Sequence, residues 1–253
     1  MKLINPDEAN CPCFVLSESY EAFEGPWHSH ERAQFVYADD GLLTVRTAAG
    51  WWVVPPQRAV WIPPRLPHQG YAPKGFRLMT LYLAAGVGPV PKRCCVLSVD
   101  PLLDALLKEA ATFGADYPAE GPEQRLMAVV LDRLARLNPF EAFLPAASDP
   151  RLITLTRQLE QSPEDPRSLD ELAAASGMTA RTAARLFSRD TGLTFTQWRQ
   201  QLRLLKALQA LSLGESVTQV ALAVGYQDVS AFIQVFKDAF GDTPARYARD
   251  RRA

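Results

Sequence analysis

The 253-residue chain contains no run of about 18 apolar residues, so no segment is long and apolar enough to cross a bilayer as a helix. Its four cysteines lack the repeated CxxC spacing of a thiolate zinc site, and we expect them to be reduced. We therefore expect a cytoplasmic protein with no membrane partner. With 47% hydrophobic and 22% charged residues, the composition is that of an ordinary globular protein, and the length suffices for two domains.

The chain also lacks an excess of positive charge, because its formal net charge is −1. The charges are nevertheless unevenly distributed. Residues 1–150 contain 13 Lys and Arg against 17 Asp and Glu, whereas residues 151–253 contain 14 against 11. This asymmetry indicates an acidic region joined to a basic one, and only the basic region suits a polyanionic partner.

Two kinds of periodicity divide the chain. Residues 14–83 are rich in β-branched and aromatic residues with frequent Gly and Pro between them, which is typical of the short strands of a sandwich or barrel. Farther on, the apolar residues recur at helical spacing, which predicts amphipathic helices that begin at Pro101 and Pro122. Three prolines within residues 138–150 predict a linker, and everything after it is expected to be helical.

An internal repeat marks the helical region. Residues 168–177 align with residues 216–225 at a shift of 48, and the residues that follow align at a shift of 49. Each copy begins with a capping box and then reaches a Gly, which permits the left-handed turn at the end of a helix. This pattern predicts two helix-turn-helix units. The capping boxes are Ser168 with Glu171 and Ser216 with Gln219, and the glycines are Gly177 and Gly225.

The second helix of each unit has three polar residues on one face, at positions i, i+4 and i+7. Arg can form two hydrogen bonds with guanine and Gln can do the same with adenine, so both faces suit the reading of base edges in a major groove. The alternative is a helical bundle whose polar faces are merely solvated, and the duplication of caps, turns and polar triplets disfavours it. The triplets are Arg181, Arg185 and Ser188 in the first unit and Ser230, Gln234 and Lys237 in the second.

A long helix is predicted between the two units, over residues 195–213. At about 1.5 Å per residue it would span roughly 28 Å. That length would hold the two reading helices about one DNA turn apart, so that both could enter successive major grooves.

Residues 148–253 resemble the DNA-binding domain of the AraC/XylS family of transcription regulators. The resemblance implies two helix-turn-helix units that bind asymmetric sites, usually beside promoters, and an architectural role for Arg203. It rests on residues 185–192, 203–207, 220–226 and 232–247. The residues expected to contact DNA are Arg181, Thr182, Arg185, Ser188, Arg189, Ser230, Gln234 and Lys237.

The second unit departs from the common pattern of this family. Val229 and Ala231 occupy positions that are often polar in its members. This departure favours phosphate anchoring by Lys237 over base reading in the second unit.

Residues 25–34 and 63–68 resemble the two motifs of the cupin sensor domain that many members of this family carry, and they contain all three histidines of the chain. The resemblance implies that His28, His30, a carboxylate four residues later and His68 would hold a divalent metal ion. Gln34 stands at the carboxylate position, and an amide is a poorer ligand for such a cation.

Three interpretations of this histidine cluster stay open. In the first, the cluster holds a divalent metal ion. In the second, it belongs to a metal-free pocket where His28, His30, Gln34 and His68 bond an organic effector. In the third, it is purely structural.

Together these patterns predict an α+β chain: an N-terminal cupin-like β-barrel followed by helices, and then an all-α C-terminal domain with two helix-turn-helix units. The expected sensor barrel comprises residues 1–97. Residues 98–147 are expected to form amphipathic helices and a linker, with a role in dimerisation. Residues 148–253 are expected to form the DNA-binding domain.

We expect a non-enzymatic transcription regulator, activator or repressor, whose promoter binding responds to a small molecule or metal ion held in the barrel. Its expected partners are double-stranded DNA, this effector and a second copy of the chain in a homodimer. One alternative is a metal-dependent cupin enzyme fused to a DNA-binding module, which requires the carboxylate that Gln34 replaces. Another is a DNA-binding protein whose degenerate barrel serves only dimerisation.

Overall fold

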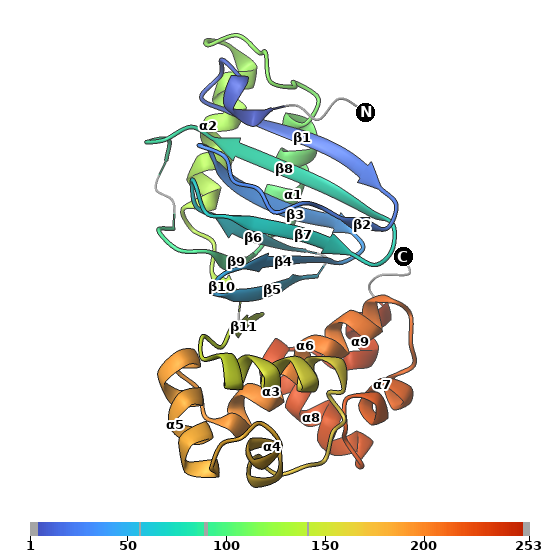
Figure 1. Cartoon of the computed structure of the whole chain (residues 1–253). Coiled ribbons are helices and arrows are strands. Elements are labelled where there is room, and N and C mark those ends of the chain that lie inside the picture. Colours follow the sequence, from blue (N-terminus) through green and yellow to red (C-terminus); the bar gives the residue numbers. More distant parts are fainter. Residues whose placement is uncertain (1–4, 56, 89–90, 141, 250–253) are drawn as a thin grey trace. The chain divides into compact units, whose positions relative to one another are not determined.

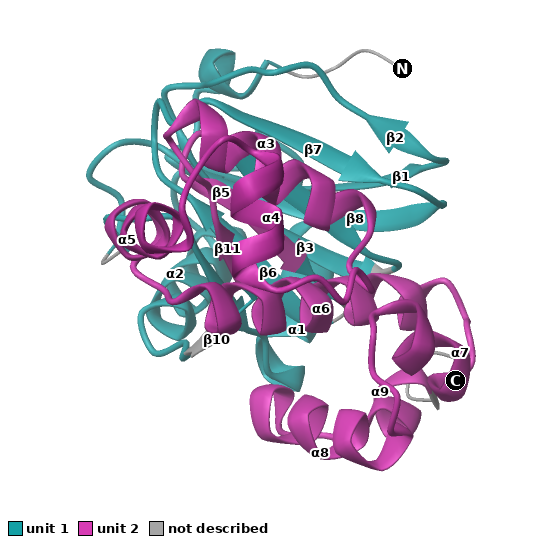
Figure 2. Cartoon of the chain, turned by 60° about the horizontal axis from the view of Figure 1, so that its bottom comes forward, with its two compact units in different colours: residues 1–47, 54–142 teal, residues 48–53, 143–253 magenta. Residues whose placement is uncertain are grey.

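The computed structural model describes residues 5–55, 57–88, 91–140 and 142–249. The chain divides into two compact units, coloured separately in Figure 2. We call residues 1–47 and 54–142 the β unit, and residues 48–53 and 143–253 the helical unit. No helix within the described ranges is long and apolar enough to cross a membrane.

The β unit contains two antiparallel sheets followed by two helices. Its elements are the 3-10 helix η1 (Pro6–Glu8), the strands β1 (Cys13–Tyr20), β2 (Phe23–Glu24), β3 (Ala33–Asp40), β4 (Leu43–Thr47), β6 (Arg58–Ile62), β7 (His68–Ala72), β8 (Phe76–Leu83), β9 (Cys95–Ser98) and β10 (Pro139–Phe140), and the helices α1 (Pro101–Ala110) and α2 (Pro122–Leu134). The larger sheet has the order β1-β8-β3-β6-β9-β10, and the smaller one contains β4, β7 and β2 in that order. The predicted fold class, a β-rich N-terminal region followed by helices, is confirmed.

Helices α1 and α2 complete the core of the β unit against the larger sheet (Figure 1). Leu103 and Leu107 of α1 and Val130 of α2 are at most 1% exposed, and they belong to one apolar cluster with Trp61 and Leu81 of the sheet. Each buried side chain of this size stabilises the fold by about 2 kcal/mol. The two amphipathic helices therefore pack on the sheet through these faces.

The helical unit contains seven helices and one pair of strands within the part of the chain that the structure describes. Its elements are β5 (Gly50–Val54), β11 (Phe143–Pro145), α3 (Pro150–Gln161), α4 (Leu169–Ala175), α5 (Ala180–Thr191), α6 (Phe195–Ser212), α7 (Val217–Ala223), α8 (Val229–Phe240) and α9 (Pro244–Arg249). Helix α6 is the predicted long helix, and the residues expected to face inward are all buried. These residues are Trp198, Leu202, Leu205 and Leu208.

The predicted linker, residues 138–150, proved to contain two strands. Strand β10 pairs with β9 in the β unit, and β11 pairs with β5 in the helical unit. Both are edge strands, where the missing N–H of Pro139 and Pro145 is tolerated. Leu144 is only 1% exposed, so burial of apolar side chains outweighs the turn-forming tendency of the prolines.

Strand β11 is bonded to helix α6. The indole Nε1 of Trp198 donates to the carbonyl of Pro145 at 2.9 Å, and the amide of Gln201 donates to the carbonyl of Phe143. The ring of Phe143 stacks on Trp52 with centroids 4.4 Å apart. These contacts explain why residues 48–53 belong to the helical unit.

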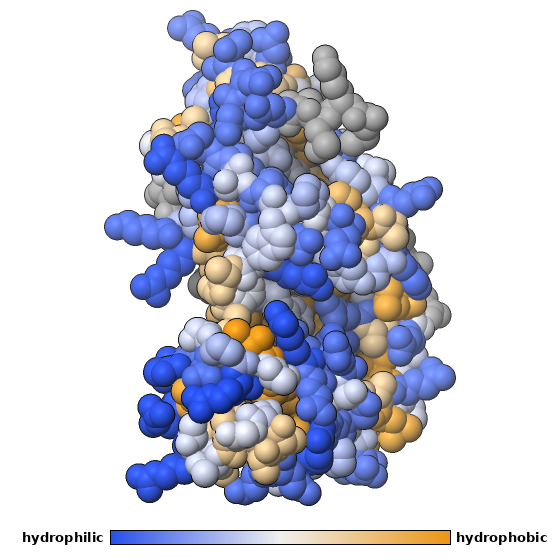
Figure 3. Space-filling view, viewed as in Figure 1, coloured by the Kyte–Doolittle hydropathy of each residue, from blue (hydrophilic) through white to orange (hydrophobic). Residues whose placement is uncertain are grey.

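Hydrophilic residues cover most of the face shown in Figure 3, and its apolar residues form separate patches. Scattered apolar side chains of this kind are normal for a protein surface. Leu102 of α1 and Val129 of α2 are among the exposed large hydrophobic residues. The role in dimerisation expected for residues 98–147 stays a prediction.

Candidate functional site

The first helix-turn-helix unit consists of α4 and α5. The Ser168 hydroxyl accepts from the backbone N–H of Glu171 at 3.3 Å, and the Glu171 carboxylate accepts from the N–H of Ser168 at 2.7 Å. The turn contains Gly177 at φ +68°, a conformation that favours glycine. The predicted capping box and turn are both confirmed.

The second unit, α7 and α8, has the same construction. Ser216 and Gln219 form its capping box, and Gly225 turns the chain at φ +85°. A Cβ atom at Gly225 would lie only 2.7 Å from Nη2 of Arg203 in α6. It would also lie 2.9 Å from the backbone Cα of Glu164, so the space here, like the positive φ, favours a glycine.

Arg203 has the architectural position expected for it. It is about half-buried, and its Nε donates to the carbonyl of Pro163 at 2.8 Å. Its Nη2 also lies 3.4 Å from the carbonyl of Asp165. The guanidinium thus fastens α6 to the loop between α3 and α4.

Helix α5 presents the first predicted triplet to the surface. Arg181, Arg185 and Ser188 are exposed, whereas Leu186 and Phe187 on the other side are at most 1% exposed. Such a division leaves the guanidinium groups accessible to an external partner. The triplet is therefore accessible, and its contact with DNA stays a prediction.

Two other α5 residues expected to contact DNA have partners within the chain. The Thr182 hydroxyl lies 3.0 Å from the Thr179 hydroxyl, at the N-terminus of α5. Nε of Arg189 donates to the Asp190 carboxylate at 2.6 Å. Arg189 remains half-exposed, so its guanidinium is accessible from outside beside this ion pair.

Asp190 is a structural residue that the sequence analysis missed. Its carboxylate accepts from the backbone N–H groups of Ser148 and Asp149, at 2.8 and 2.9 Å, and from the Ser148 hydroxyl at 2.7 Å. The hydrogen bond from Arg189 and these further bonds hold the pKa of Asp190 far below its usual range. Asp190 thus ties the end of α5 to the start of α3.

Helix α8 presents the second predicted triplet, and Ser230, Gln234 and Lys237 are all exposed. The amide Nε2 of Gln234 donates to the Asp238 carboxylate at 2.7 Å. The i, i+4 spacing of this pair is a local signal that the sequence contains. The second reading surface therefore contains an acidic residue that the first lacks at the equivalent position.

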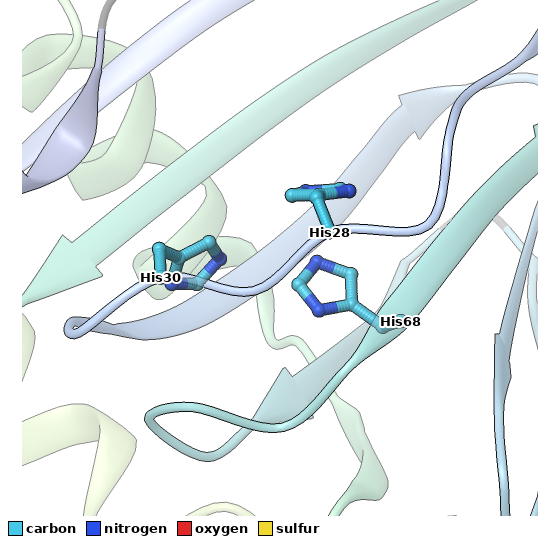
Figure 4. Close-up of side chains that lie close together, drawn as sticks. All are labelled: His28, His30 and His68. Carbon is cyan, nitrogen blue, oxygen red and sulfur yellow. The ribbon is translucent and has the colours of Figure 1, made fainter.

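The three histidines come together in the β unit (Figure 4). His28 and His30 lie in the segment before β3, and His68 begins β7. One ring nitrogen of each lies within 4.8 Å of the others. Backbone hydrogen bonds between His28 and His68, at 2.9 and 3.0 Å, hold the two segments together.

Each histidine ring is oriented by a backbone carbonyl. The Nδ1 atoms lie 3.1 Å from the Pro26 oxygen for His28, 2.7 Å from the Arg32 oxygen for His30 and 2.9 Å from the Leu66 oxygen for His68. Because a carbonyl only accepts, Nδ1 carries the proton in each ring, and a neutral ring keeps its lone pair on Nε2. Burial lowers the pKa of His68 to about 4, so this ring is neutral at pH 7.

Gln34 joins the cluster from β3. Its side-chain amide lies 3.2 Å from Nε2 of His30 and 3.2 Å from the Tyr82 hydroxyl. The amide has both donors and acceptors, so it can bond two neighbours without a charge. The structure thus brings together all four residues expected to bind an effector or a metal ion.

A cavity of about 120 Å³ opens beside these residues. Apolar side chains such as Val36, Ile62 and Leu78 form much of its wall. His28, Gln34 and His68 line one part of it, whereas His30 does not belong to the lining. The polar residues Glu18 of β1 and Tyr82 of β8 also line the cavity, and the sequence analysis had not identified them.

Comparison with known proteins identifies the family. A model described as "AraC-like ligand binding domain" matches residues 10–87, and one described as "Helix-turn-helix domain" matches residues 172–250. The HTH-type transcriptional regulator NimR of Escherichia coli K12 is 34% identical over 234 residues, which cover 92% of this chain and 86% of that protein. This chain belongs to the AraC family of transcription regulators.

Other similar proteins match either one region or most of the chain. The transcriptional activator NphR of a Rhodococcus species is 36% identical over 101 residues, 39% of this chain and 30% of that protein. A crystal structure of ToxT from Vibrio cholerae O395 covers 94% of this chain and 97% of its own, with 10% identity and a TM-score of 0.41. The relatives and both matched domains indicate a DNA-binding AraC-family regulator with a ligand-binding domain, which confirms the prediction that the chain is not an enzyme.

Proposed function

We propose that this AraC-family regulator binds a small molecule or metal ion in the cavity of its β unit, and that this binding changes its affinity for promoter DNA. The observation that carries the proposal is the apolar cavity beside three convergent histidines, inside the region that matches the ligand-binding domain. A largely apolar pocket with a few convergent polar groups is the usual form of a small-molecule site. The effector would act by binding two states of the chain with different affinity.

We propose further that the exposed faces of α5 and α8 contact DNA. The exposure of both polar triplets and their matched positions in two helix-turn-helix units support this role. Lys237, an exposed ammonium group on α8, would bond phosphate. The proposed contacts are Arg181, Thr182, Arg185, Ser188, Arg189, Ser230, Gln234 and Lys237.

A metal ion is the second candidate for the histidine cluster. The three Nδ1 contacts with carbonyl oxygens support it, because bound metals are commonly held by histidines whose second nitrogen donates to such a group. The ligands would be Nε2 of His28, His30 and His68, a neutral set that suits zinc or nickel better than magnesium. Gln34 would add no counter-charge.

The test combines DNA binding with metal analysis. Genome-wide mapping of the DNA bound by the full chain would supply a natural site, and its affinity would be measured with and without ZnCl₂. Bound metal in the purified chain, its loss in His68→Ala and an altered DNA affinity would support metal sensing. If the purified chain held no metal and its affinity for DNA were the same with and without ZnCl₂, the metal candidate would be contradicted. The organic effector would then remain as the ligand.

A further inference from the structure

The cavity has a polar side with one strong hydrogen-bond acceptor, the carboxylate of Glu18. Among the described residues of its wall there is one carboxylate, Glu18, and there is neither Lys nor Arg. Nδ1 of His28 and Nδ1 of His68 each face a backbone carbonyl oxygen, so these two nitrogens are already engaged within the chain. The wall therefore favours a partner that donates hydrogen bonds or carries positive charge.

Glu18 is the strongest of these groups. It is half-buried on β1, and the Tyr20 hydroxyl donates to its Oε2 at 2.7 Å. Burial and this carboxylate raise the pKa of Tyr20, so the hydroxyl keeps its proton and stays a donor. Oε1 of Glu18 has no partner among the described residues, so it can accept a bond from a ligand.

The size of the cavity limits the ligand. An engineered apolar cavity of about 150 Å³ is known to hold one benzene molecule. The cavity here, about 120 Å³, is slightly smaller. It therefore limits the ligand to about one small ring, whose apolar part would pack on side chains such as Val36, Ile62 and Leu78.

We infer that the effector is a compact one-ring compound bearing a protonated amine or another N–H donor, and that Glu18 accepts this group. The inference rests on the proposed function, since it names the ligand class of the same cavity. Carboxylate ligands are disfavoured because their charge would face Glu18 with no cation in the wall to offset it. The selectivity of the site thus comes from charge, and its affinity comes from the apolar wall.

The test uses isothermal titration of the full chain with three one-ring probes: benzylamine, benzyl alcohol and benzoate. We expect benzylamine to bind most tightly. Glu18→Gln should weaken benzylamine binding about tenfold or more, because a hydrogen bond to a charged group is lost, and should leave benzyl alcohol nearly unaffected. Glu21→Gln removes an exposed carboxylate near the end of β1 that does not line the cavity, and this control should bind like the unchanged chain.

A second variant, Leu78→Trp, fills the cavity and should abolish binding of benzylamine even if Glu18→Gln fails to fold. Thermal unfolding of each variant would establish that it is folded.

Three outcomes would contradict the inference. If benzoate bound more tightly than benzylamine and this binding were lost in Leu78→Trp, the ligand class would be wrong and the proposed function would stay intact. Binding of benzylamine that requires ZnCl₂ and survives Glu18→Gln would overturn the role of Glu18. Failure of all three probes would overturn the inference, while the response of DNA affinity to ZnCl₂ would still test metal sensing separately.

Discussion

The two helix-turn-helix units share a buried framework and differ on the surface. Both begin with a capping box and turn at a glycine with positive φ, and Phe187 and Phe236 occupy equivalent core positions with 0% exposure. Their reading helices, however, present Arg185 in α5 and Gln234 in α8. The comparison teaches that packing constrains the interior of each copy, whereas the exposed face is free to acquire its own binding chemistry.

A second difference concerns how each reading helix is anchored. The end of α5 is bonded to the start of α3 through Asp190, whereas the equivalent residue of α8 is Ala239. In α8 the carboxylate near the end of the helix is Asp238, which accepts from Gln234 on the same helix. An acidic group thus secures the fold in the first copy and orients a reading side chain in the second.

The shared framework predicts the largest effects. Phe187→Ala and Phe236→Ala should each lower the free energy of unfolding by about 3–5 kcal/mol, because both remove a fully buried ring. Urea denaturation of the full chain would measure both losses. An exposed control in each helix, Ala184→Ser and Ala231→Ser, should change little. If only one of the two phenylalanine substitutions left the free energy of unfolding nearly unchanged, the two cores would not be equivalent.

The anchoring difference predicts a pH-dependent effect. Asp190→Asn should cost roughly 1.5–3 kcal/mol at pH 7, since the Asp190 side chain is only 2% exposed and its charge accepts several bonds. Folding lowers the pKa of Asp190, so its contribution is complete above the ordinary carboxyl pKa of about 4 and declines as the pH falls below it. The stabilities of the two proteins should therefore approach each other as the pH falls below about 4. Asp238→Asn, which removes an exposed carboxylate of α8 and leaves the contacts of Asp190 in place, would be measured as the control.

The reading faces predict unequal effects on DNA binding. Arg185→Ala should weaken specific binding by about 1–3 kcal/mol and relax the preference at one base position. Gln234→Ala should cost less, because the Gln234 amide already has a partner in Asp238. Electrophoretic mobility shifts on a mapped site and its single-base variants would measure both. If Arg185→Ala changed neither affinity nor preference, the assignment of this face would be wrong.

The smallest effect should come from Lys237→Ala. Lys237 is exposed on α8, and loss of one phosphate contact should weaken binding to all sequences alike. The slope of log affinity against log salt should fall in magnitude by about 1. A loss confined to one base position would instead make Lys237 a base-reading residue and bring the second unit closer to the first.

Much of the site could be predicted because its signals are local. A capping box needs residues three positions apart, and a helical face repeats within a few residues, so Ser168, Ser216 and both polar triplets could be found by aligning the chain with itself. The histidines could be found through two short motifs. Glu18 and Tyr82 could not be found in this way. Glu18 lies on β1 and Tyr82 on β8, about sixty residues farther along the chain, and only the pairing of β8 with both β1 and β3 brings them to the histidines.

The amino-acid sequence by itself determined the two helix-turn-helix units, the long helix between them and the three histidines as candidates for binding, since each depends on spacing along the chain. Only the tertiary structure decided that residues 138–150 pair as edge strands, that Asp190 anchors α3, and that Glu18 faces the cavity with the histidines. The physical reason is that these contacts join distant segments. Burial of apolar side chains brings such segments together, and no local pattern records which polar groups then become neighbours.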